Sequence, residues 1–237
     1  MTTTRHAPAA NGPAGLVRSP IPRAFLPVAL SAFLGLCALA LLTWPAREVL
    51  FEGVAGGTTT SPLAGLIGLV ADKGLLALVA ITAGLVLFTW FRDRPRFGLL
   101  AAAGAGTVAA YAASEVVKLL VAEERPCRVV DVATVLPCPA PGDWSWPSNH
   151  SAIAGALAVA CLLVAPRLWS AVVPLALAVA GARVAAGVHY VHDVASGLAL
   201  GVLVAWLVGL AVYAGAQRLT RRSTSRRSPA ARRTTGR

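Results

Sequence analysis

Apolar stretches separated by short polar segments run through most of this chain. Six of them approach or reach the length that crosses a hydrocarbon core about 30 Å thick. Backbone polar groups in lipid must find partners within the chain, so each stretch predicts a helix. The expected fold is all-α, a polytopic bundle of six transmembrane helices over residues 24–43, 73–91, 98–120, 151–165, 169–188 and 194–215.

Composition supports a membrane protein and excludes an ordinary soluble domain. Hydrophobic residues make up 57% of the sequence and charged residues 13%, whereas soluble domains carry about 25% charged residues. We expect one membrane domain over residues 24–216. A basic cytoplasmic segment (1–23) precedes it. A basic tail without apolar periodicity (217–237) follows it and is predicted to be disordered and cytoplasmic.

The net charge of +11 is concentrated on one side of this predicted topology. Arginines precede the first span, separate the second from the third and the fourth from the fifth, and follow the sixth. The positive-inside rule places both termini in the cytoplasm of a multi-pass plasma-membrane protein. The basic termini would attract anionic lipid headgroups. Nucleic-acid binding is not expected, because the tail has no aromatic residues to stack on bases.

The first apolar stretch has a second interpretation. A basic segment followed by an apolar run is typical of a signal peptide, and Ala38-Leu39-Ala40 has the small-residue spacing of a cleavage site. The run over 24–42 is longer than the usual apolar region of such peptides, which favours a retained helix. Both interpretations stay open at the level of sequence.

Polar motifs fall at the predicted outward ends of the spans. Lys118 lies near the end of the third span and Arg125 follows seven residues later, so two helical turns would bring both to one face. Pro126 then ends or bends the helix. A lysine reaching for the interface and an arginine at its boundary would explain each residue taken alone.

The segment Pro147-Ser148-Asn149-His150 opens the fourth span. Ser148 is the expected N-cap, and the free amides of the first helical turn, with the positive end of the helix dipole, form a ready anion site. His150 lies in that first turn. The alternative is a purely structural role, with a capping serine followed by an interfacial histidine. Trp144 and Trp146 are interpreted as interfacial anchors.

His189 and Asp193 are four residues apart and could meet within a helix or across a tight break near Gly187. A carboxylate that holds one imidazole nitrogen leaves the other free to attack. Arg183 stands in a span of small apolar residues, where an arginine is costly and implies an anionic partner. His192 is expected to point elsewhere on the helix, as an interfacial residue.

A metal site is the main chemical alternative, with His150, His189, His192 and Asp193 as candidate ligands. Three nearby cations would oppose a divalent metal, so neither a metal nor another cofactor is predicted. The cysteines form two pairs by environment. Cys37 and Cys161 lie in apolar spans. Cys127 and Cys138 share an outward loop where a disulfide is possible, and the bonded and free states both remain open.

At these residues the chain resembles the type-2 phosphatidic acid phosphatases, membrane relatives of the vanadium haloperoxidases. That family's pattern is a lysine, six residues and Arg-Pro; then Pro-Ser-Gly-His; then Ser-Arg, five residues, a histidine, three residues and an aspartate. This chain matches it between Lys118 and Asp193 with the same spacing. It departs at Asn149, which replaces the glycine, and at Ala182, which replaces the serine.

The resemblance implies a metal-independent phosphoric ester or diphosphate hydrolase. His189 would be the nucleophile that forms a phosphohistidine, Asp193 would orient it, and His150 would serve as acid and then base. The phosphate oxygens would be held by preorganised donors, namely Lys118, Arg125, Ser148, Asn149 and Arg183.

A site at the membrane boundary favours a lipid phosphate, either of the phosphatidic acid type or a polyprenyl (undecaprenyl) diphosphate. Two other classes remain: a lipid-phosphate binding or transport protein without turnover, and a phosphatase or phosphotransferase acting on a soluble ester. The oligomeric state is not indicated by the sequence.

Overall fold

The structure is a computed structural model that describes residues 25–226, and every regular element within them is helical. The predicted N-terminal segment 1–23 and residues 227–237 of the predicted tail lie outside this range. The elements are α1 (Phe25–Thr43), α2 (Arg47–Thr59), α3 (Ala64–Arg92), α4 (Arg94–Val121), α5 (Pro126–Val129), α6 (Asn149–Val164), the 3-10 turn η1 (Pro166–Leu168), α7 (Trp169–Ala185) and α8 (Val191–Arg226).

Each of the six predicted spans corresponds to a helix, which agrees with the predicted multi-pass all-α fold. Among the described helices, α1, α3, α4, α8 and α7 together with η1 are long and apolar enough to cross a membrane. The sixth, α6, has 16 residues and is shorter than a usual span. It packs against α8, α4, α7 and α3 and is buried along most of its length, so it forms the centre of the bundle.

The largest differences from the sequence prediction are two helix boundaries and one additional helix. The α3 helix begins at Ala64 rather than near residue 73. The α2 helix was not predicted: it buries Phe51 and Ala55 against Tyr190, a contact that only the folded chain creates. The α8 helix continues to Arg226, into the segment predicted to be disordered.

Small residues allow α6 and α8 to approach closely. A Cβ atom added to Gly201 would lie 2.0 Å from the carbonyl oxygen of Ala152, and one added to Gly197 would lie 2.5 Å from that of Ser148. Any larger side chain would separate the two helices. This contact brings the start of α6 beside the start of α8, where the candidate site residues lie.

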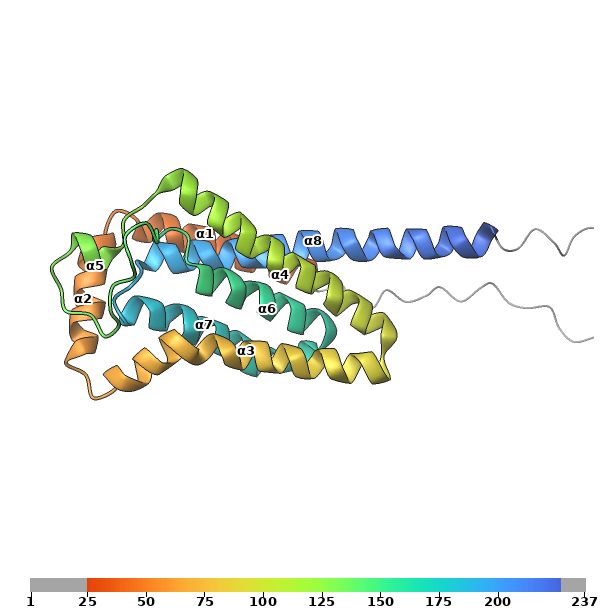
Figure 1. The fold of residues 1–237 in the computed structure, drawn as a ribbon, viewed down its shortest axis with the longest axis horizontal. Coiled ribbons are helices and arrows are strands. Elements are labelled where there is room, and N and C mark those ends of the chain that lie inside the picture. The colour runs from red at the N-terminus through yellow and green to blue at the C-terminus, as the bar shows by residue number, and fades with distance from the viewer. Residues whose placement is uncertain (1–24, 227–237) are drawn as a thin grey trace, which may run out of the picture.

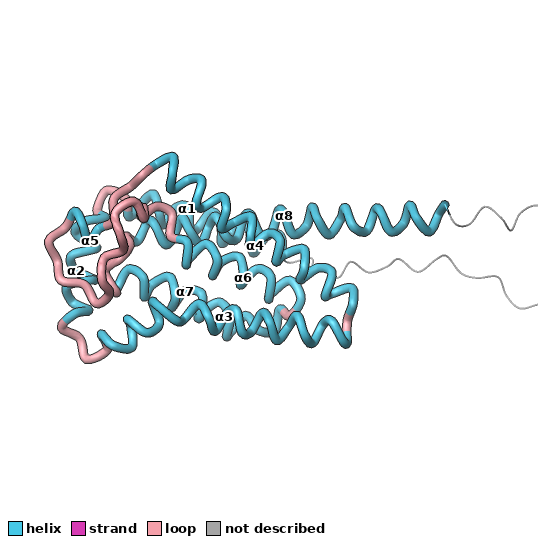
Figure 2. The backbone as a smooth tube through the Cα atoms, in the orientation of Figure 1, coloured by secondary structure: helices cyan, strands magenta, loops and turns pink. Residues whose placement is uncertain are grey.

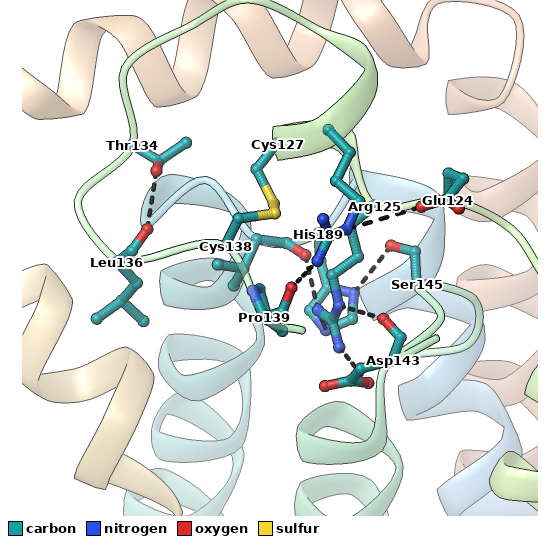
Figure 3. The surroundings of a disulfide bond; sticks show 12 residues. Glu124, Arg125, Cys127, Thr134, Leu136, Cys138, Pro139, Asp143, Ser145 and His189 are labelled. Atoms are coloured by element: carbon teal, nitrogen blue, oxygen red, sulfur yellow. Dashed lines mark hydrogen bonds and ion pairs between the residues drawn. A yellow bond between two sulfur atoms is a disulfide. The ribbon is translucent and has the colours of Figure 1, made fainter. Parts of the chain in front are cut away.

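The connections that carry the polar motifs gather at one end of the bundle (Figure 1). The long loop between α5 and α6 lies there with α2 and the α7–α8 connection (Figure 2). A disulfide joins Cys127 of α5 to Cys138 in the middle of this loop, with a Cα–Cα distance of 5.8 Å (Figure 3). The bond closes an 11-residue separation and restricts the segment that leads from Arg125 to α6.

Candidate active site

Arg125 lies at the centre of the polar cluster. It does not reach this position as part of the Lys118 helix, which its spacing from Lys118 had predicted. The α4 helix ends at Val121, and Ala122 adopts a left-handed conformation with φ of 51°. Arg125 is therefore an extended residue before α5 rather than part of the Lys118 helix. The expected two helical turns are wrong, because the helix ends three residues after Lys118, before one full turn is complete.

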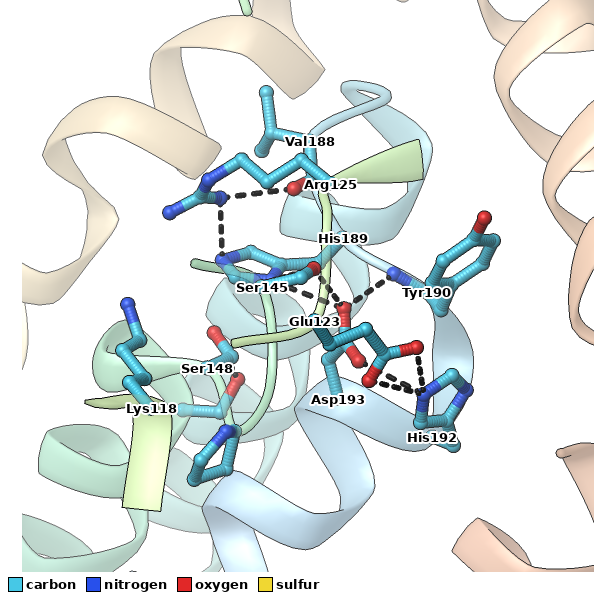
Figure 4. A network of polar contacts seen from close by, with 12 residues as sticks. Lys118, Glu123, Arg125, Ser145, Ser148, Val188, His189, Tyr190, His192 and Asp193 are labelled. Carbon is cyan, nitrogen blue, oxygen red and sulfur yellow. Dashed lines mark hydrogen bonds and ion pairs between the residues drawn. The ribbon is translucent and has the colours of Figure 1, made fainter. Parts of the chain in front are cut away.

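The guanidinium of Arg125 is almost fully buried, and its nitrogens have partners on two loops. Nε donates to the carbonyl oxygen of Asp143 at 2.7 Å, and Nη1 donates to that of Val188 at 2.9 Å. Nη1 also lies 3.0 Å from Nε2 of His189 (Figure 4). Arg125 thus joins the loop before α6 to the loop before α8.

A carboxylate lies between the first two predicted phosphate ligands. Oδ1 of Asp143 is 2.8 Å from Nη2 of Arg125 and 3.4 Å from Nζ of Lys118, the latter on the last turn of α4. Burial alone would raise the pKa of Asp143, but the hydrogen bond and charge of Arg125, with a contribution from Lys118, hold that pKa below its ordinary value. The Asp143 side chain is nevertheless 49% exposed.

His189 and Asp193 meet across a break, the second of the two predicted arrangements. The α7 helix ends at Ala185, Gly187 turns the chain with φ of +84°, and α8 begins at Val191. Nδ1 of His189 then lies 3.2 Å from Oδ2 of Asp193. A ring that donates from Nδ1 to a carboxylate keeps its lone pair on Nε2. That lone pair faces Nη1 of Arg125.

Burial lowers the pKa of His189 to about 3, with the charge of Arg125 acting in the same direction and the Asp193 hydrogen bond opposing both. The imidazole is therefore neutral at physiological pH. A neutral ring with its lone pair on Nε2 is the form of histidine that can act as a nucleophile.

The remaining predicted residues lie around the same space. Arg183 donates from Nη1 to the carbonyl oxygen of Ala71 at 3.3 Å, and its buried Nε has no partner among the described residues. Ser148 occupies the N-cap position of α6 but makes no side-chain capping bond; its hydroxyl accepts from Ser151 at 3.2 Å. Ala182, at the family's serine position, is buried.

The side chain of Asn149, a predicted phosphate ligand, is hydrogen-bonded to α4. Its amide donates to Glu115, and its carbonyl oxygen accepts from the hydroxyl of Ser114 at 2.6 Å. The two bonds tie the first residue of α6 to the C-terminal third of α4.

These side chains enclose a pocket of about 270 Å³. Its polar wall consists of the three cations, both histidines and two further residues, and its apolar wall comes from α3, α4 and α6. The lining residues are Lys118, Arg125, Arg183, His150, His189, Asp143, Asn149, Leu75, Tyr111 and Ile153. A pocket with three cations and a neutral imidazole is suited to a phosphate group.

Comparison with known proteins bears on this arrangement directly. Residues 99–216 match the PAP2 superfamily and include every predicted site residue. The chain contains a PAP2 superfamily domain.

Relatives of the PAP2 domain carry names that refer to lipid phosphates. A Sulfolobus acidocaldarius protein named undecaprenyl-diphosphatase is 37% identical over 101 residues, which are 42% of this chain and 48% of that protein. A Mycobacterium tuberculosis protein named decaprenylphosphoryl-5-phosphoribose phosphatase is 37% identical over 122 residues, 51% of this chain and 64% of that protein. The chain thus spans about half to just under two thirds of the length of these curated relatives.

A solved structure shares the fold of the chain. It is the transmembrane PAP2 type phosphatidylglycerolphosphate phosphatase from Bacillus subtilis, with a TM-score of 0.54 and 23% sequence identity. The match covers 76% of this chain and 93% of the other. At this identity it establishes a common arrangement of helices.

The PAP2 domain also contains site residues that the sequence analysis missed. Ser145 is fully buried, and its hydroxyl donates to Oδ2 of Asp193 and lies 3.3 Å from Nδ1 of His189. The interpretation of His192 as an interfacial residue is wrong: it is 1% exposed, and its Nε2 lies 3.0 Å from Asp193 and 3.3 Å from Glu123 (Figure 4). The start of α8 is covered by Trp44, which the helical position of His192 could not reveal.

The four residues considered as rival metal ligands do not gather at one point. Among the described residues, the group with the proximity of a metal site is Glu123, His192 and Asp193, whose ligand atoms lie within 4.8 Å of one another. Proton sharing between one imidazole and two carboxylates accounts for this proximity. His150 and His189 are not part of that group and line the phosphate-sized pocket instead.

The low pKa of His189 predicts that the protein becomes less stable to unfolding at acidic pH. The imidazole titrates near 6.5 in the unfolded chain and near 3 in the PAP2 domain, so between these values the unfolded state binds more protons. The free energy of unfolding should therefore fall as the pH drops below 6.5, by at most about 1.4 kcal/mol per pH unit. Thermal unfolding in detergent between pH 7 and 4.5 measures this, with His189→Asn as a non-titrating control. Parallel curves for the two proteins would contradict the assignment.

Proposed function

We propose that the protein is an integral-membrane lipid phosphatase that hydrolyses a phosphate monoester or diphosphate, of the polyprenyl or phosphatidic acid type, through a phosphohistidine on His189. The observation that carries the proposal is the lone-pair nitrogen of His189 facing a pocket that Lys118, Arg125 and Arg183 also line. The names of the two curated relatives support a polyprenyl phosphate as the substrate.

In the first step, the Nε2 lone pair of His189 attacks phosphorus and the bond to the lipid oxygen breaks. His150 gives its proton to that oxygen, so the lipid leaves as a neutral alcohol or, from a diphosphate, as a monophosphate. His189 gains positive charge, which the Asp193 carboxylate stabilises through Nδ1–H. Arg125 redirects Nη1 from His189 to the phosphate oxygens, where charge develops.

In the second step, His150 accepts a proton from a water molecule that attacks the phosphohistidine. The P–N bond breaks, its electron pair returns to Nε2 of His189, and inorganic phosphate leaves. The three cations of the pocket supply the charge stabilisation that a metal ion provides in many other phosphatases.

The apolar wall of the pocket supports a lipid rather than a soluble substrate. Leu75 of α3, Tyr111 of α4 and Ile153 of α6 line the same space as the cations. A lipid could place its headgroup among the charged residues while its chain remains in hydrocarbon. With cytoplasmic termini, as the arginine distribution predicts, the site would face outward.

Phosphate release by the purified, detergent-solubilised full chain in excess EDTA tests the proposal. Phosphatidic acid, a polyprenyl diphosphate and a short soluble phosphate ester are assayed side by side. Metal-independent release from either lipid, faster than from the soluble ester, is expected. Equal rates on the soluble ester would favour the soluble-substrate class. Binding of the lipids without release would identify a binding or transport protein.

The position of Asp143 predicts a specific effect on product binding. Its carboxylate occupies the donors of Arg125 and Lys118 that phosphate would use, so phosphate must displace it. Asp143→Asn should therefore lower the inhibition constant for inorganic phosphate by about tenfold. Steady-state inhibition measures this, and Glu124→Gln removes an equal charge from the connection between α4 and α5 as a control. Weaker inhibition in Asp143→Asn would show that the carboxylate orients the cations instead.

A further inference from the structure

A second imidazole lies against the far side of the aspartate that orients His189. Nε2 of His192 is 3.0 Å from Oδ1 of Asp193 and 3.3 Å from each carboxylate oxygen of Glu123 (Figure 4). Both neighbours are acceptors, so Nε2 carries a proton. Together the residues form a continuous polar chain in the order His189, Asp193, His192, Glu123.

Packing alone does not explain this chain. The His192 ring lies edge-on to Trp44, with centroids 4.4 Å apart, and is stacked on Tyr190 at 5.3 Å. A phenyl ring would fill the same space. Instead, Nδ1 of His192 is buried with no hydrogen-bond partner among the described residues, and the Glu123 side chain is only 15% exposed. Burying these polar groups costs stability that a phenyl ring would not lose.

The chain fixes the orientation of the Asp193 carboxylate. Oδ2 accepts from the Ser145 hydroxyl, from the backbone amide of Tyr190 at 2.8 Å and from His189. Oδ1 accepts no hydrogen bond among the described residues and lies 3.0 Å from Nε2 of His192, an ion-pair contact. The three hydrogen bonds on Oδ2, with the Nε2–H of His192 beside Oδ1, keep the carboxylate turned toward the imidazole that it orients.

Glu123 also affects the charge available at Asp193. A proton on His192 near Oδ1 would draw negative charge away from His189, which needs that charge when it becomes cationic. Both oxygens of the Glu123 carboxylate lie 3.3 Å from the same Nε2, so Glu123 shares this proton and offsets the effect. The backbone carbonyl of Glu123 further accepts from the amide of Ser145 at 2.8 Å. Glu123 therefore supports Asp193 in two ways: its carboxylate contacts His192, and its backbone carbonyl holds Ser145, which donates to Asp193.

We propose that His192 and Glu123 are positioning residues of the phosphoryl-transfer reaction, holding Asp193 in the orientation and charge state that His189 requires. The inference rests on the phosphohistidine chemistry proposed above. Neither residue touches the phosphate pocket, so their effect should fall on the chemical step rather than on substrate binding.

Two substitutions of His192 separate this role from packing. His192→Phe keeps an aromatic ring between Trp44 and Tyr190 and removes the Nε2 donor. The kcat for lipid phosphate hydrolysis should fall about 10- to 100-fold with an unchanged KM. The Tm should fall as well, because two buried carboxylates lose a donor. His192→Gln should recover part of kcat, because its amide can donate to both carboxylates.

A pair of neighbouring carboxylates provides the matched control. Glu123→Gln keeps the shape and loses the charge, and should lower kcat about tenfold. Glu124→Gln removes the same charge from a half-exposed residue that pairs with Arg128 at 3.8 Å, and should leave kcat unchanged. Equal effects of the two substitutions would indicate general electrostatics and overturn the inference.

Wild-type kcat in His192→Phe would also overturn it, as would a loss of kcat that comes with a raised KM and that His192→Gln does not recover in part, which indicates a packing role. These results differ from a failure of the proposed function. If the wild-type protein releases no phosphate from any lipid, that function fails and the inference falls with it. If the wild-type protein turns over and the variants match it, only the inference is overturned.

Discussion

Replacing His189 with glutamine should lower phosphate release at least about 10⁴-fold, because it removes the group that forms the covalent intermediate. Glutamine is close in size to histidine and can still donate to Asp193, so the contacts that close the loop before α8 are largely retained. The protein should remain folded and inserted. Single-turnover assays of phosphate release with a labelled lipid phosphate measure the loss.

Trapping of the intermediate provides the accompanying test. Wild-type protein quenched during turnover should carry phosphate in an acid-labile, alkali-stable bond, as phosphohistidine does, and His189→Gln should carry none. A residual rate within tenfold of the wild type, or label retained in the variant, would assign the nucleophile to another residue.

Replacing Arg125 with lysine should lower kcat/KM about 10³-fold although the charge is kept. An ammonium group cannot replace a guanidinium whose three nitrogens contact Asp143, Val188 and His189. The buried carbonyl oxygens of Asp143 and Val188 would lose donors at a cost of about 1–3 kcal/mol each. The Tm should therefore fall together with activity.

Arg128 offers the matched control for this substitution. It lies three residues further along, more exposed, and pairs with Glu124 and the carbonyl oxygen of Pro139 outside the pocket. Arg128→Lys should retain kcat/KM within about twofold, since exposed ion pairs contribute little. Equal losses in the two variants would mean that Arg125 acts through the general charge of the loop.

The sequence predicted the helices that hydropathy determines and the motif residues that spacing identifies. Apolar runs made six helices predictable because lipid leaves the backbone few alternatives. The α2 helix escaped prediction because its helical pattern is interrupted by glycines, and because Phe51 becomes buried only when Tyr190 packs on it.

The supporting residues could not be predicted because their contacts connect loops that are far apart in the chain. Ser145 and Asp193 are separated by 48 residues, and Glu123 and His192 by 69. The loop between α5 and α6 has no periodicity from which a facing direction could be inferred. His192 was misjudged because its position at the start of a span suggests an interface, whereas Trp44 covers it.

The disulfide between Cys127 and Cys138 makes the final stage of assembly a chemical step. Cys127 lies two residues after Arg125, so the bond anchors the segment that seats this arginine beside His189. Thiols pair in oxidising surroundings and stay reduced in the cytosol. If the site faces outward, as proposed above, a newly made chain reaches the membrane with this segment untethered. We then expect its activity to mature only after oxidation, so that the first turnover follows synthesis by the time that export of this loop takes.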